Sequence, residues 1–93
     1  SAEDEENLRI IRAAVVPGSR VTIVGYTDRL GDAGANETLA ARRARAVADA
    51  LRLPPDVPVT VRSEGNAALY DPTIPEGRAY TRTVEVIIES PAR

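Results

Sequence analysis

The stretch from Val21 to Leu51 constrains the fold most, because it places a strand and a long helix on either side of one polar loop. Val21–Val24 is a short β-rich run without charge, which is typical of a buried strand. It leads through Gly25 into a loop of Asp, Gly and Asn residues, which tolerate turns and leave backbone N–H groups and carboxylates free to meet a ligand. An amphipathic helix over Asn36–Leu51 follows. The pattern therefore predicts a helix that packs on a sheet.

The predicted helix carries an arginine near the middle of its apolar face. With a rotation of about 100° per residue, the apolar residues fall in one sector of the helix. They are Leu39, Ala40, Ala44, Ala46, Val47, Ala50 and Leu51. Arg43 projects from the same sector. A buried and unpaired guanidinium carries a large desolvation cost, so we expect Arg43 to have an anionic partner or to reach out to a ligand.

Asp28 is the candidate partner, because the loop that holds it ends at the N-terminus of the helix that carries Arg43. In one interpretation, Asp28 and Arg43 form a structural ion pair that fixes the loop. In the other, both side chains belong to a ligand site. The spacing alone leaves both interpretations open, since structural ion pairs and functional sites both perturb charges.

The rest of the chain completes an α/β (α+β) sandwich. Its predicted segments are a helix near Asn7–Val15 and two further strands at Val59–Glu64 and Arg82–Glu89. Apolar residues at helical spacing behind an acidic run define the helix, and alternating patterns define the strands. The Asn-, Asp-, Pro- and Gly-rich segment Gly65–Gly77 is predicted to be a surface loop. We therefore expect a mixed sheet that two main helices cover on one face.

Composition excludes several classes of function. The chain has 93 residues, a formal net charge of −2 and neither Cys nor His. This charge argues against a nucleic-acid partner, for which a basic footprint is expected. Without Cys and His, thiol catalysis, histidine general-base chemistry and the usual zinc sites are removed. We predict one domain over residues 1–93, and no residue pattern in it indicates a cofactor.

The acidic residues of the loop suggest two weaker interpretations. Asp28, Asp32, Asn36 and Glu37 cluster in the sequence, but their spacing does not match an EF-hand, so no metal site is predicted. A hydrolase would need paired carboxylates and an apolar cleft wall, and the sequence supplies no such wall. Arg43 would also keep nearby carboxylates ionised.

The loop and the helix resemble the OmpA-like, peptidoglycan-associated domain, whose pattern runs roughly G-[HY]-T-D, x2, G, x4, N, x2, L-S, x2, R-A. The matching residues here are Gly25-Tyr26-Thr27-Asp28, Gly31, Asn36, Leu39, Arg43-Ala44 and Val47. A second match lies at residues 75–86, PEGRAYTRTVEV, which resemble the closing segment of the family, in which a Gly-Arg turn leads to an N-R-R-V-E-type strand. The order and the gap lengths agree from Val21 to Ile88.

The resemblance implies a non-catalytic module that anchors bacterial envelope proteins to the cell wall. Its ligand would be the peptide stem of peptidoglycan, most often at diaminopimelate. By position, Asp28 would hold the ammonium of the ligand and Arg43 its carboxylate, which a bidentate guanidinium suits. The implied ligand-binding residues are Asp28, Arg43, Thr27, Asn36, Gly31 and Arg82. Backbone N–H groups at the start of the helix near Asn36 would also favour an anion.

The sequence departs from the family pattern at three places. Tyr26 stands where many members have His, and Ala40 replaces the usual Ser after Leu39. Thr81-Arg82-Thr83 replaces Asn-Arg-Arg, so only the central arginine is retained. Arg82 would meet the ligand carboxylate or Asp28, or it would lie at the sheet edge in a structural role.

The resemblance also implies the setting of the domain. The family fold is of the βαβαββ type, and no strand precedes the first predicted helix here, so we expect an N-terminally truncated fragment of a longer envelope protein. The expected location is the periplasmic face of the bacterial outer membrane, with membrane association supplied by other parts of the parent protein. An unpaired sheet edge would favour a homodimer. The alternative function is a protein–protein interaction or oligomerisation module in which Asp28 and Arg43 form a structural ion pair.

Overall fold

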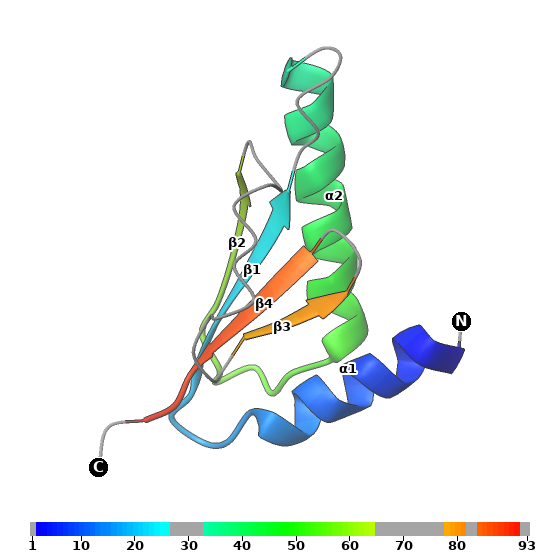
Figure 1. The fold of residues 1–93 in the computed structure, drawn as a ribbon. Helices are drawn as coiled ribbons and strands as arrows, with labels where there is room; N and C mark the ends of the chain where they lie inside the picture. The colour runs from blue at the N-terminus through cyan, green and yellow to red at the C-terminus, as the bar shows by residue number, and fades with distance from the viewer. Residues whose placement is uncertain (1, 27–32, 65–77, 82–83, 92–93) are drawn as a thin grey trace.

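The computed structural model describes residues 2–26, 33–64, 78–81 and 84–91, which form two helices and four strands (Figure 1). In chain order the elements are α1 (Ala2–Ala14), β1 (Arg20–Tyr26), α2 (Ala33–Leu51), β2 (Val59–Glu64), β3 (Arg78–Thr81) and β4 (Val84–Glu89). None of the described helices is long and apolar enough to cross a membrane.

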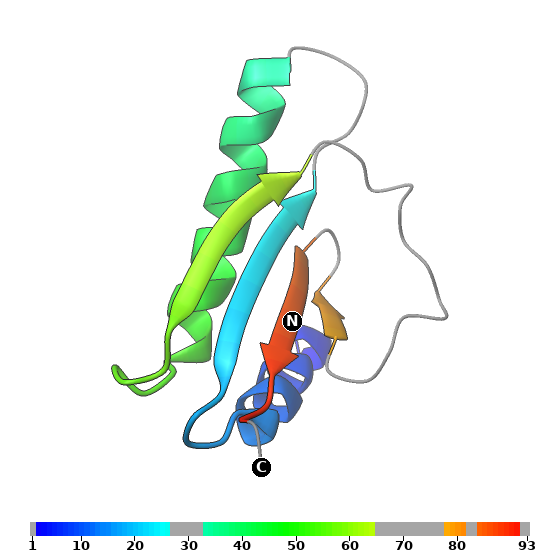
Figure 2. The ribbon, with the colours of Figure 1, turned by 90° about the vertical axis from the view of Figure 1, so that its left-hand side faces the viewer.

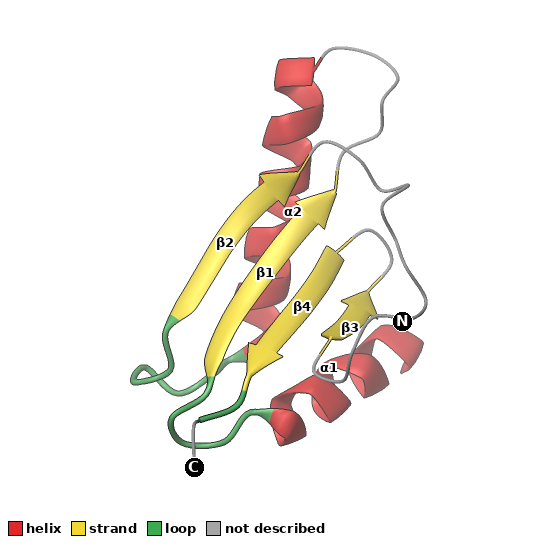
Figure 3. Ribbon diagram, turned by 60° about the vertical axis from the view of Figure 1, so that its left-hand side comes forward, coloured by secondary structure: helices red, strands yellow, loops and turns green. Residues whose placement is uncertain are grey.

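The four strands form one mixed sheet in the order β2-β1-β4-β3 (Figure 3). β1 and β2 run parallel and are joined by the crossover helix α2, whereas β4 pairs antiparallel with both β1 and β3. Both helices lie on the same face of the sheet (Figure 1, Figure 2). The predicted mixed sheet with helices on one face is confirmed.

The core is aliphatic and lies between the sheet and the helices. Its buried residues are Ile11, Val21, Ile23, Ala44, Leu51, Val57, Val84 and Val86. The register of the strands explains why these residues meet. Val21 and Ile23 of β1 lie opposite Ile88 and Val86 of β4, and residues that face each other across neighbouring strands point to the same side of the sheet.

α1 joins the core through the residues that its spacing predicts. Ile11 is buried, and Leu8 and Val15 pack against the same cluster. The guanidinium of Arg12 donates hydrogen bonds to the carbonyl oxygens of Leu51 (2.8 Å) and Ala50 (3.2 Å), which lie at the C-terminal end of α2. α1 is therefore held to α2 both by apolar packing and by satisfying carbonyl groups that a helix end leaves without intrahelical partners.

The strand β3 was not predicted. Arg78–Thr81 pairs with β4 in an antiparallel register, with Tyr80 opposite Glu85, and lies at the edge of the sheet. The sequence hides this strand, because four residues of mixed character are too few to set up an alternating pattern. The predicted strand Arg82–Glu89 is observed from Val84 onward, and residues 82–83 lie outside the described part of the chain.

The prediction that Arg43 lies within the buried face of α2 is wrong. Ala40, Ala44 and Leu51 are buried, whereas Leu39 is 45% exposed and Arg43 and Ala46 are also exposed. At about 100° per residue, the buried row is centred roughly 80° away from Arg43 around the helix. Leu39 and Ala46 are apolar but lie beside the buried residues. They made the predicted apolar face too wide and moved its centre toward Arg43.

Candidate functional site

The candidate site is built where β1 ends and α2 begins, at one end of the molecule (Figure 1). β1 ends at Tyr26 and α2 begins at Ala33, and residues 27–32 between them lie outside the described part of the chain. The described part of the site is therefore the end of the strand together with the first half of α2. Its geometry depends on how closely these two elements approach each other.

Gly25 sets that approach. A Cβ atom built on Gly25 would lie 2.1 Å from the carbonyl oxygen of Ala40, a distance that a real side chain does not tolerate. Gly25 is thus the residue at which the backbone of β1 packs directly against the backbone of α2. Arg43 follows Ala40 by three residues, which is slightly less than one helical turn. The close contact therefore holds the α2 segment that carries Arg43 next to the end of β1.

The structure describes only part of the predicted ligand-binding set. Arg43 is exposed on α2, and within the described residues it makes no hydrogen bond or ion pair. The backbone of Asn36 lies in the first turns of α2. Thr27, Asp28, Gly31 and Arg82 lie outside the described residues. The pairing of Asp28 with Arg43 and the ligand-binding roles remain predictions.

The exposure of Arg43 changes the energetics on which the structural interpretation depends. An exposed guanidinium remains hydrated, so it does not need an anionic partner to offset a desolvation cost. An ion pair made at such a position contributes only about 0–1 kcal/mol to stability. Arg43 therefore requires no structural partner, and its side chain is accessible to a ligand.

Sequence reasoning missed a buried carboxylate beside the end of β1. Glu85 of β4 is only 2% exposed, and the phenol of Tyr26 donates a hydrogen bond of 2.7 Å to its Oε1 atom. Successive side chains of a strand alternate between its faces, so Glu85 lies on the side opposite Val84 and Val86, which belong to the core cluster. The sequence does place this acidic residue between two valines, Val84 and Val86, which could have indicated its burial. The sheet order then shows that β4 is an internal strand.

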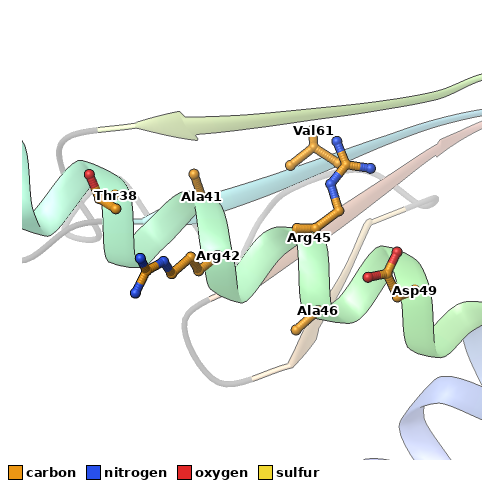
Figure 4. A pocket seen from close by; sticks show the side chains of 7 residues that line it. All are labelled: Thr38, Ala41, Arg42, Arg45, Ala46, Asp49 and Val61. Carbon is orange, nitrogen blue, oxygen red and sulfur yellow. The ribbon is translucent and has the colours of Figure 1, made fainter.

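A shallow groove lies elsewhere on α2, between its outer surface and the strand β2 (Figure 4). It has a volume of about 630 Å³. Its lining residues are Thr38, Ala41, Arg42, Arg45, Ala46, Asp49 and Val61. Arg43, the predicted ligand-binding residue whose side chain the structure describes, is not among these lining residues.

Charges in the rest of the described chain do not form a further site. In those residues, no group of three or more acidic side chains has the arrangement of a metal site. A hydrogen bond from Arg9 lowers the pKa of the Glu6 carboxyl, and this exposed pair lies within α1. Arg62 and Glu64 form an ion pair of 3.1 Å on the edge strand β2. Asp28 and Asp32, two of the four residues whose spacing was compared with an EF-hand, lie outside the described residues.

Comparison with protein-family models gives a match over residues 1–79, to a model described as the OmpA family. The matched range includes β1, the loop, α2 and β2, and it ends within β3.

Three curated relatives are similar to this chain, and each is named peptidoglycan-binding protein ArfA. They come from Mycobacterium bovis (strain ATCC BAA-935 / AF2122/97) and from Mycobacterium tuberculosis strains CDC 1551 / Oshkosh and ATCC 25618 / H37Rv. Each is 41% identical to this chain over 75 residues, which cover 77% of this chain and 23% of the relative. The chain thus spans about a quarter of the length of these relatives.

Proposed function

This chain belongs to the OmpA family, and from that premise we propose that it is a non-catalytic module that binds peptidoglycan in a bacterial cell envelope. The similarity to relatives that are named peptidoglycan-binding proteins supports this function. The aligned 75 residues are long enough to contain a whole small domain, which makes this part of the relatives a reasonable carrier of the named activity.

We propose further that the ligand is the peptide stem at diaminopimelate. One end of diaminopimelate carries an ammonium and a carboxylate on a single carbon. Asp28 would hold the ammonium, and the guanidinium of Arg43 would hold the carboxylate. Thr27, Gly31, Asn36 and Arg82 would complete the site, as their matches to the family pattern imply.

The single observation that carries this proposal is the exposure of Arg43 beside the strand end. The side chain has no partner among the described residues, and the Gly25–Ala40 contact holds its helix next to β1. An arginine in this position is available to a carboxylate ligand at little cost in desolvation.

The proposed setting is a longer envelope protein that is anchored to the cell wall through this domain. The finer location that we propose is the periplasmic face of an outer membrane. Parts of the parent protein outside this chain would supply any membrane association. The short span of the chain relative to its relatives is consistent with a domain of a larger protein.

A second candidate function is an interaction module that forms a homodimer through the sheet edge. The edge position of β2 favours it, because Val59 is 39% exposed there. An edge strand presents unpaired backbone groups to another chain. Sedimentation analysis over a range of protein concentrations tests this candidate, and a monomer at every concentration would exclude it.

The decisive experiment is a calorimetric titration of the domain with diaminopimelate and with a diaminopimelate-containing muropeptide. The ligand control is a muropeptide with lysine in place of diaminopimelate, because the free end of its side chain carries an ammonium without the carboxylate. We expect saturable binding of the first two ligands and none of the lysine-containing muropeptide. Arg43→Ala should abolish binding while lowering stability by no more than about 1 kcal/mol, since the side chain is exposed.

Arg42→Ala is the matched control, because it removes a neighbouring exposed arginine of the same helix that lines the groove beside β2. It should bind like the wild type. A well-folded wild-type domain that binds neither ligand would refute stem-peptide binding. Equal losses in Arg42→Ala and Arg43→Ala would instead point to a general effect of positive charge.

A further inference from the structure

The end of β1 is held from both faces of the sheet. On the helix face, Gly25 packs against the backbone of α2 at Ala40. On the opposite face, the Tyr26 phenol donates its hydrogen bond to Glu85 of the neighbouring strand β4. Successive residues of a strand point to opposite faces, so two adjacent residues make these two contacts. Tyr26 is the last residue of β1, which places both contacts where the strand leaves the sheet.

The strand register places Glu85 where it can hold Tyr26. Val24 lies directly opposite Glu85, and Tyr26 follows Val24 by two residues on the same face. A diagonal pair of this kind is within reach of an aromatic side chain. The neighbouring position of β1 and β4 is visible in Figure 3. The hydrogen bond therefore crosses from the end of β1 to an internal position of β4.

Because Glu85 is buried, its hydrogen bond restricts the position of Tyr26 more than an exposed hydrogen bond would. A buried carboxylate needs hydrogen-bond donors, and a bond from a phenol to a carboxylate is stronger than one between two neutral groups. Glu85 is almost fully buried, and the bond to Tyr26 is short. Movement of the strand end would stretch this bond, so Glu85 limits the positions that Tyr26 can occupy.

We propose that Glu85 is a positioning residue, which acts through Tyr26 to fix the end of β1 beside the Arg43 segment of α2. This inference rests on the proposed function, because the arrangement matters for affinity only if the stem peptide binds there. Glu85 does not contact the ligand in this proposal. It fixes the position of Tyr26, which precedes Thr27 and Asp28 in the sequence.

The test measures muropeptide affinity and stability in Tyr26→Phe, in Glu85→Gln and in the double variant. Tyr26→Phe removes only the hydroxyl group and keeps the ring. In metal sites, loss of a residue that orients a ligand-binding group costs about 10–100-fold in affinity, so we expect a loss near the lower end, about tenfold, for Tyr26→Phe. Glu85→Gln should lose less, because its amide oxygen still accepts a hydrogen bond from the phenol.

The double variant and a remote control separate positioning from general destabilisation. If both side chains act through one shared hydrogen bond, the double variant binds no more weakly than Tyr26→Phe. The control is Arg12→Ala, which removes the hydrogen bonds to Leu51 and Ala50 at the opposite end of α2. It should lower stability and leave affinity within about twofold of the wild type, because a remote site behaves independently.

Each outcome decides the proposal. Unchanged affinity in folded Tyr26→Phe, with a stability loss like that of Arg12→Ala, would overturn the positioning role and leave the proposed function intact. If Tyr26→Phe does not fold, Glu85→Leu takes its place, because it removes the acceptor and keeps a side chain of similar size. Unchanged affinity in folded Glu85→Leu overturns the positioning role in the same way. A wild-type domain that does not bind the muropeptide overturns the proposed function, and this inference with it.

Discussion

At the scale of single residues, Arg52 shows where the backbone of this domain departs from the preferences of its side chain. α2 ends at Leu51, and Arg52 directly after it has a φ of 49°. Among the residues that the structure describes, Arg52 is the only one other than glycine with a positive φ. The left-handed region costs an L-residue roughly 1–2 kcal/mol, and helices commonly place a glycine just beyond their end for this reason.

We predict that Arg52→Gly stabilises the domain by about 0.5–1 kcal/mol, because glycine adopts this φ without a steric cost but makes the unfolded chain more flexible. Urea unfolding would show a higher midpoint at an unchanged dependence on urea concentration. Arg52→Ala is the control, because it removes the same charge and keeps a Cβ atom. An equal gain in Arg52→Ala would assign the effect to charge rather than to the backbone.

At the scale of elements, the contact between β1 and α2 decides where the candidate site can form. Gly25 and Ala40 allow the two backbones to approach closely. Buried Ala44 continues the contact along α2, and Leu51 completes it at the end of the helix. Three of these four residues are Gly or Ala, which explains how a long helix lies so close to the sheet at the end that carries Arg43.

We predict that Gly25→Ala destabilises the domain by about 3 kcal/mol, the upper end of the usual cost of overpacking, because the new Cβ atom meets rigid backbone. The same variant should bind the muropeptide more weakly, since α2 has to move away from β1. Chemical unfolding and calorimetry check the two effects. A stability within 1 kcal/mol of the wild type would contradict the close approach of β1 and α2.

At the scale of the whole molecule, one aliphatic cluster joins elements from all parts of the chain. The cluster takes residues from α1, β1, α2 and β4, and it includes Val57 from the segment before β2. Arg12 adds a polar connection between the two helices. A domain with one shared core is expected to unfold cooperatively, because no element keeps its packing when the others are lost.

We predict that unfolding is a single transition, and that Ile23→Ala lowers the free energy of unfolding by about 2–5 kcal/mol while keeping that single transition. Ile23 is fully buried in β1, so its truncation leaves a cavity in the shared core. Circular dichroism reports the helices, and tyrosine fluorescence reports the three tyrosines, which include Tyr26 at the end of β1. Two separated transitions would show that α1 or the sheet unfolds on its own.

Several features of this molecule followed from local patterns in the chain. The helix spacing of Leu8, Ile11 and Val15 predicted the packed side of α1, and the strand Val59–Glu64 has the predicted bounds. The predicted mixed sheet and the family are likewise confirmed. These predictions succeeded because periodicity and motif spacing are properties of neighbouring residues. The ligand-binding roles of Asp28 and Arg43 are not tested by the structure.

By itself, the sequence determined the succession of strand, loop and helix, the aliphatic nature of the core and the membership of the family. Only the tertiary structure decided that Arg43 is exposed and that Glu85 is buried. It also decided that Arg78–Thr81 pairs with β4 as a strand. The physical reason is that burial depends on how a helix is rotated against the sheet and on contacts between residues far apart in the chain. Tyr26 and Glu85 are 59 residues apart in sequence, and only the folding of the sheet brings them together.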